Sequence, residues 1–92
     1  MTPADRIIEA VAENLMVSVS AIKSQDKSRK VTKARHIAMA VIRRRCSLSC
    51  GQISRKFFGK DDHSTVKYAC NKVASDPELS ELADDIESGL TA

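Results

Sequence analysis

Hydrophobic residues recur at helical spacing along most of this 92-residue chain. Near the N-terminus the apolar positions from Ile7 to Leu15 form one stripe, which predicts an amphipathic helix. Thr2 and Asp5 stand before this stripe with the three-residue spacing of a capping box. Pro3 suits the first helical position, where its missing N–H costs nothing. The pattern therefore predicts a first helix that begins after Thr2 and ends near Leu15.

A short helix, a polar loop and a long helix are predicted next. Ser18 is the expected N-cap of the short second helix. Residues 23–30 are polar and lack apolar periodicity, so we expect a basic loop there. A long helix is then predicted at about residues 31–46. Its expected core residues are Ile37, Met39, Ala40 and Val41.

Two helices joined by a short turn follow. Ser49 and Gln52 repeat the capping-box spacing and predict a helix that ends near Phe57. Gly59 fits the left-handed residue that often ends a helix, and Asp62 is the N-cap candidate of the next one. The expected buried residues are Cys50, Ile53 and Phe57 in the first helix and Val66, Ala69, Cys70 and Val73 in the second.

The last predicted helix is acidic on its outer face. Asp76 and Pro77 form an N-cap followed by Pro at the first helical position, and apolar residues then recur from Leu79 to Leu90. No segment shows the alternation of a strand. We therefore predict an all-α fold in one domain, residues 1–92: a small five- to six-helix bundle. It would contain a helix-turn-helix at residues 49–75 and an acidic C-terminal helix at residues 77–90.

The net charge of +3 conceals an uneven distribution of charge. Residues 23–60 contain 12 Lys and Arg and one acid, Asp26, whereas residues 74–92 contain six acids and no base. Such asymmetry within a small domain favours a surface that faces a polyanion. A charged face that is merely solvated is the alternative reading.

Composition argues against several other classes. No apolar run approaches the ~20 residues of a membrane helix, and no signal peptide is visible, so we expect a cytoplasmic protein with no membrane partner. Cys46, Cys50 and Cys70 are expected to be free thiols, because they are odd in number and lack a secretory context. Their spacing also does not match that of zinc ligands. The strand-borne nucleophile elbow of a hydrolase is also missing. We therefore expect no enzyme, no metal and no cofactor.

The two helices around Gly59 have the organisation of a helix-turn-helix, in which the first turn of the second helix meets base edges in the major groove. Here that turn contains His63, Ser64 and Thr65. His63 can donate a hydrogen bond to purine N7, and the two hydroxyls can bind base edges. Asp62 and Thr65 could instead be only a capping pair, with His63 a solvated surface residue, and the chemistry alone supports both readings equally.

Several stretches of the chain together match one known family. They are residues 8–12 and 17–19, residues 33–40, Leu48 and Ser49 with Ile53, Phe57 with Gly59, Lys60 and residues 62–66, and Ala69, Cys70, Lys72 and Val73. On these stretches the chain resembles the C-terminal DNA-binding domain of the bacterial chromosomal replication initiator DnaA, and the resemblance implies a Trp-repressor-like bundle. The most specific part is the run Asp62-His63-Ser64-Thr65-Val66, which is close to the family's signature.

The resemblance implies DNA-binding roles for individual residues. Family members read bases from the run that matches Asp62, His63, Ser64 and Thr65. They also place an Arg from the basic loop in the minor groove, for which Lys27 fits by position and Arg29 by chemistry. Contacts to the DNA backbone are implied for Lys33, Arg35, His36, Arg43, Ser49, Cys50, Gly51, Lys60 and Lys67. Among these, residues 49–51 begin a helix, and helix N-termini bind phosphate well.

The chain departs from the family pattern in two respects. The turn at residues 57–63 is one residue longer than usual and has Lys60 in place of Arg, so the family's target site is not carried over. The chain also lacks the G-x-x-x-x-G-K-[ST] loop of an ATPase, so we expect no nucleotide binding. Thr2 and Pro3 at one end and the acidic helix at the other look like natural ends. They favour a free-standing protein over an excised domain.

The sequence therefore predicts sequence-specific binding of double-stranded DNA, through recognition of a DnaA-box-like site in replication initiation or its regulation. Replication proteins are a second class of partner that the resemblance implies. Two alternatives stay open: a transcriptional regulator, and a protein-interaction module that uses the acidic C-terminal helix.

Overall fold

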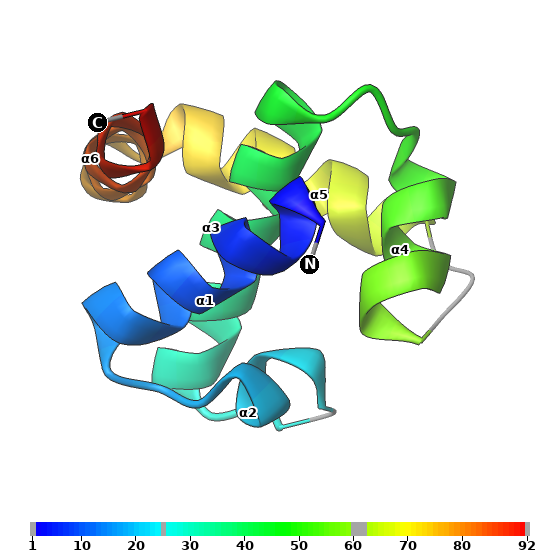
Figure 1. Cartoon of the computed structure of the whole chain (residues 1–92), viewed down its shortest axis with the longest axis horizontal. Helices are drawn as coiled ribbons and strands as arrows, with labels where there is room; N and C mark the ends of the chain where they lie inside the picture. The colour runs from blue at the N-terminus through cyan, green and yellow to red at the C-terminus, as the bar shows by residue number, and fades with distance from the viewer. Residues whose placement is uncertain (1, 25, 60–62, 92) are drawn as a thin grey trace.

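The computed structural model describes residues 2–24, 26–59 and 63–91, and this part of the chain forms six α-helices and no strand (Figure 1). The prediction of an all-α bundle is confirmed. The helices are α1 (Pro3–Leu15), α2 (Val19–Lys23), α3 (Arg29–Arg45), α4 (Cys50–Phe58), α5 (His63–Ser75) and α6 (Pro77–Thr91).

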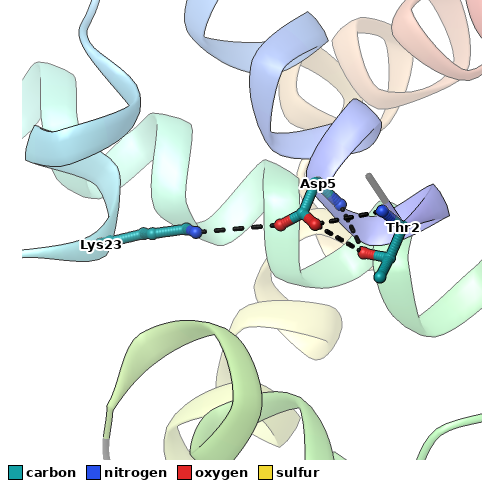
Figure 2. Close-up of polar contacts among 3 residues, drawn as sticks. All are labelled: Thr2, Asp5 and Lys23. Carbon is teal, nitrogen blue, oxygen red and sulfur yellow. Dashed lines mark hydrogen bonds and ion pairs between the residues drawn. The ribbon is translucent and has the colours of Figure 1, made fainter.

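The capping box of α1 forms as predicted (Figure 2). The Asp5 N–H donates to Thr2 Oγ1 at 3.2 Å, and the Thr2 N–H donates to Asp5 Oδ2 at 3.1 Å. The Thr2 hydroxyl also donates to Asp5 Oδ2 at 2.8 Å, and this bond, with that from the Thr2 N–H, lowers the pKa of Asp5 from its ordinary value. Lys23 lies 3.8 Å from the other carboxylate oxygen of Asp5. The cap therefore also connects α1 to the end of α2.

The other predicted caps that lie in the described residues form as well. Ser18 Oγ accepts from the Ala21 N–H at the start of α2. Ser49 and Gln52 form a reciprocal capping box at the start of α4. At the start of α6, Asp76 Oδ1 accepts from the Glu78 N–H at 3.0 Å. The predicted N-cap of α5, Asp62, lies outside the described residues.

Helix α3 is the centre of the core and packs against each of the other five helices. All residues at positions 37–42 are buried, so this part of α3 is apolar around its whole circumference. A helix with that pattern is expected to be surrounded by others. The four predicted core residues of α3 are confirmed. Val31, Ala34, Ala38 and Ile42 join them.

The basic loop is shorter than predicted. Lys23 belongs to α2, and α3 begins at Arg29, so the connection comprises residues 24–28 rather than 23–30. Arg and Lys are good helix formers, but Arg29 and Lys30 are exposed in the first turn. Apolar periodicity therefore gave no signal there.

The buried side of helix α4 is not the one predicted. Ile53, Ser54 and Phe58 are buried, whereas Phe57 and Cys50 are only partly buried. A serine at a position that is 2% exposed hid this side from a pattern based on apolar residues. Gly59 ends the helix with φ 66°, the left-handed conformation predicted for it.

Helices α4 and α5 pack directly against each other, as a helix-turn-helix requires. In Figure 1, α5 runs from α4 towards α6, which lies at the opposite side of the molecule from α4. Within the described residues no helix is both long and apolar enough to cross a membrane.

Candidate nucleic-acid interface

The first turn of α5 presents polar side chains to solvent. His63 and Ser64 are exposed, and Thr65 is partly buried. Val66 is fully buried beneath them and fixes this turn on the core. Lys67 is exposed one residue further on. Of the residues predicted to read bases, three are therefore placed on one accessible turn, whereas Asp62 lies outside the described residues, as does the predicted backbone contact Lys60.

The start of α4 lies beside the start of α5. A Cβ atom placed on Gly51 would lie 3.9 Å from the Cβ of His63. Ser49 Oγ accepts from the Gln52 N–H, which satisfies one of the amides that a helix leaves without an intrahelical partner. The amides of Cys50 and Gly51 belong to the same first turn. The predicted phosphate contact and the predicted base contacts are thus neighbours.

A pocket of about 110 Å³ joins the start of α5 to the connection between α2 and α3. Thr65 and Lys27 both line it, together with the apolar side chains of Met39 and Phe58. The structure therefore brings together a predicted base-reading residue and a predicted minor-groove residue. Arg29, the other minor-groove candidate, is exposed on the first turn of α3 and does not line this pocket.

The connection that carries Lys27 is held by its own polar side chains. The Asp26 N–H donates to Ser24 Oγ at 3.1 Å, and the Ser28 N–H donates to Asp26 Oδ1 at 2.8 Å. The bonds from Ser28 lower the pKa of Asp26 from its ordinary value. Short polar side chains commonly fix turns in this way.

Arg35 is directed at the end of α2. Its Nε donates to the carbonyl oxygen of Ile22 at 2.8 Å, and its Nη2 donates to those of Ala21 at 3.1 Å and Ser24 at 2.9 Å. Carbonyls at the C-terminal end of a helix lack intrahelical donors, so the guanidinium caps α2. Burial lowers the pKa of Arg35 from its ordinary value, and the charge of Asp26 opposes this effect. A direct phosphate contact by Arg35 stays a prediction.

His36 is partly buried against α5. Its ring meets the ring of Tyr68 edge to face, with 5.7 Å between the centroids. Burial lowers the pKa of His36, and the charges of Arg35 and Lys72 lower it further. Burial and the two neighbouring cations therefore favour the neutral imidazole.

Several basic residues of α3 are paired with acids of α6. Lys33 Nζ lies 3.0 Å from Glu78 Oε1. Arg44 is paired with Asp84 and Glu87, and Arg45 with Glu87. Arg43 is exposed and is not in an ion pair within the described part of the chain. The predicted backbone contacts Lys33 and Arg43 thus have different surroundings.

Sequence reasoning missed two of these arrangements. It did not assign Arg35 to the carbonyls of α2, because nothing in the spacing of residues 21–35 shows which way a guanidinium points. It also did not pair α3 with α6. The signal for that pairing was present, since a basic segment and an acidic segment of one small domain attract each other.

Comparison with known proteins gives the family. The model of the family described as the bacterial dnaA protein helix-turn-helix matches residues 4–73. The chain belongs to this family. The resemblance predicted from the sequence is thereby confirmed.

Individual members of the DnaA family agree. The chain is 40% identical to the chromosomal replication initiator protein DnaA of Crocosphaera subtropica, over 87% of this chain and 19% of that protein. It is 46% identical to the DnaA protein of Lachnoclostridium phytofermentans, over 78% of this chain and 16% of that protein. It therefore spans less than a fifth of these relatives.

A solved structure supports the same assignment for the fold. A crystal structure described as a DNA replication initiation factor superposes with a TM-score of 0.84 at 31% identity, over 95% of this chain and 27% of that one. Membership of a helix-turn-helix family supports DNA binding rather than catalysis.

Proposed function

We propose that this domain binds double-stranded DNA sequence-selectively, by recognising a DnaA-box-like site in replication initiation or its regulation. The observation that carries the proposal is the shared pocket of Thr65 and Lys27, which joins the start of α5 to the α2–α3 connection. A helix and an adjacent loop arranged in this way can engage neighbouring major and minor grooves.

The proposed mechanism divides the contacts between two tasks. The first turn of α5, with His63, Ser64 and Thr65, reads base edges in the major groove. Lys27 enters the minor groove, with Arg29 as the neighbouring cation. Phosphates are contacted by exposed bases such as Arg43 and Lys67 and by the amides at the start of α4, and these contacts set the position of the domain. The proposal assigns Asp62 to the reading turn by family resemblance.

Selection from a random duplex library is the first test. Bound duplexes should converge on one motif, because side chains on a fixed helix turn discriminate among base pairs. Mapping of bound sites in cells then separates replication origins from promoters. A library that stays random after repeated rounds would contradict sequence-selective binding.

Substitution of His63 or Thr65 is the second test. His63→Ala and Thr65→Val should each cost about 1–3 kcal/mol of binding free energy on the selected duplex and relax its specificity. Arg43→Gln is the matched control, because loss of a phosphate contact should weaken all duplexes alike. Fluorescence anisotropy titrations on selected and scrambled duplexes measure both effects. If the His63 variant kept full discrimination, the base-reading assignment would be wrong.

A further inference from the structure

Three consecutive arginines, residues 43–45, end α3, and they differ in whether they pair with carboxylates of α6. Arg44 Nη1 lies 3.0 Å from Asp84 Oδ1 and 3.6 Å from Glu87 Oε1. Arg45 Nη1 lies 3.6 Å from Glu87 Oε2. Glu87 therefore bridges the two guanidiniums. We call these four side chains the arginine–carboxylate network.

Arg43 lies outside this network. Successive residues of an α-helix point about 100° apart, so three in a row cannot face one partner. Arg43 is exposed and pairs with no carboxylate in residues 2–24, 26–59 and 63–91. Other exposed bases also have no carboxylate partner in these described residues. On the α2–α3 connection, the first turn of α3 and α5, they are Lys27, Arg29, Lys30, Lys67 and Lys72.

The helix that carries the carboxylates of the network lies away from α4 (Figure 1). Helix α6 supplies these carboxylates, and Figure 1 shows α6 at the opposite side of the molecule from α4, beside which α5 begins. Asp84 and Glu87 thus pair with Arg44 and Arg45, whereas Arg43 is in no ion pair within the described part of the chain.

We propose that Asp84 and Glu87 are specificity-determining residues, because they occupy Arg44 and Arg45 and so confine phosphate contacts to the side that carries the start of α5. The inference rests on the proposed DNA-binding function. Non-specific binding is almost wholly electrostatic, so every unoccupied guanidinium adds to it regardless of sequence. A duplex held by Arg44 and Arg45 would lie away from the residues that read bases.

Competition, rather than stability, is the proposed role of the network. The Arg44 and Arg45 side chains are about one-third exposed, and exposed ion pairs contribute little to folding. A fixed carboxylate nevertheless competes directly with phosphate, since both bind a guanidinium through charge-assisted hydrogen bonds. A phosphate that approaches either arginine must compete with the neighbouring carboxylate for the guanidinium charge.

The test compares two double variants of α6 that remove the same charge. Asp84→Asn/Glu87→Gln releases Arg44 and Arg45. Glu81→Gln/Asp85→Asn is the control, because Glu81 and Asp85 are exposed and pair with no base in the described residues. For the first variant, affinity for a scrambled duplex at low salt should rise on the order of 5- to 10-fold, and its log–log salt slope should steepen by about 1–2. Affinity for the selected duplex should change less.

A second pair of variants checks the source of the added affinity. Arg44→Gln/Arg45→Gln should lower scrambled-duplex affinity less in the otherwise wild-type domain than in the Asp84→Asn/Glu87→Gln domain, since the carboxylates already reduce the use of these bases. Combined with Asp84→Asn/Glu87→Gln, it should return the raised affinity to the wild-type level. Failure of this reversal, or equal gains in the test and control variants, would overturn the inference. A wild-type domain that cannot distinguish selected from scrambled duplex would instead contradict the proposed function.

Discussion

Arg35 lies between the end of α2 and the connection that carries Lys27, and its guanidinium binds three carbonyl oxygens there. Family resemblance implies that this residue contacts DNA, while its geometry makes it a structural cap. The two roles predict different behaviour in a variant. If Arg35 only positions Lys27, it affects duplex affinity through Lys27. If Arg35 contacts a phosphate, it contributes to duplex affinity independently of Lys27.

Replacing Arg35 should therefore loosen the connection. Arg35→Gln should lower the free energy of unfolding by about 1–3 kcal/mol, because charged hydrogen bonds to partly buried carbonyls are lost. Arg35→Lys should recover only part of this, since an ammonium cannot reproduce the planar fork of a guanidinium. Urea denaturation measures the stability, and amide hydrogen exchange at residues 24–28 measures the loosening.

A double-mutant cycle with Lys27 decides how Arg35 affects DNA binding. If Arg35 positions Lys27, the Arg35→Gln effect on duplex affinity should largely vanish in a Lys27→Gln background. Fully additive losses would show that Arg35 contacts the DNA independently of Lys27.

His36 should make stability depend on pH. Its folded pKa lies below the ordinary value of 6.5, chiefly because burial disfavours the imidazolium. The corresponding stability is fully present above the unfolded pKa and is lost as pH falls through that value towards the folded pKa. His36→Gln should remove this part of the dependence. Urea unfolding from about pH 7.5 to about pH 5.5, a range that brackets the ordinary histidine pKa, measures it. Parallel curves for the two proteins would contradict the prediction.

At the scale of elements, the caps were the most predictable features. Thr2, Ser18, Ser49 and Asp76 all accept hydrogen bonds from the predicted helix starts. Each cap involves residues within one turn of one another, so its chemistry is visible in the sequence. The buried side of α4 could not be predicted in the same way, because Ser54 occupies a core position although it is polar.

The cap of α4 should stabilise the helix-turn-helix measurably. Ser49→Ala should cost about 0.5–2 kcal/mol of unfolding free energy, because the Gln52 N–H loses its acceptor. Ser47→Ala is the matched control, since Ser47 is exposed in the preceding connection. Thermal unfolding followed by circular dichroism compares the two. Equal midpoints would show that this cap does not stabilise α4.

At the scale of the whole molecule, the fold separates charge. Glu78, Asp84 and Glu87 of α6 pair with Lys33, Arg44 and Arg45, while other bases of the basic segment stay exposed. A net charge of only +3 therefore understates the positive potential of the side proposed to face DNA.

Duplex affinity should therefore fall steeply with salt. The logarithm of the binding constant should decrease linearly with the logarithm of salt concentration, with a slope of about −0.9 for each phosphate neutralised. Titrations of the selected duplex between low and physiological salt measure that slope. A flat response would contradict a phosphate-based interface.

The sequence by itself determined the capped starts of α1, α2, α4 and α6, the end of α4 at Gly59, the DnaA family and the residues proposed to read DNA, because these depend on neighbours along the chain. Only the tertiary structure decided which partner each base of α3 meets. Helical spacing sets the angle at which Arg35, Arg43 and Arg44 leave the helix, but not which element lies at that angle. Arg44 and Asp84 are 40 residues apart, and only the packing of α6 beside α3 brings them within 3.0 Å.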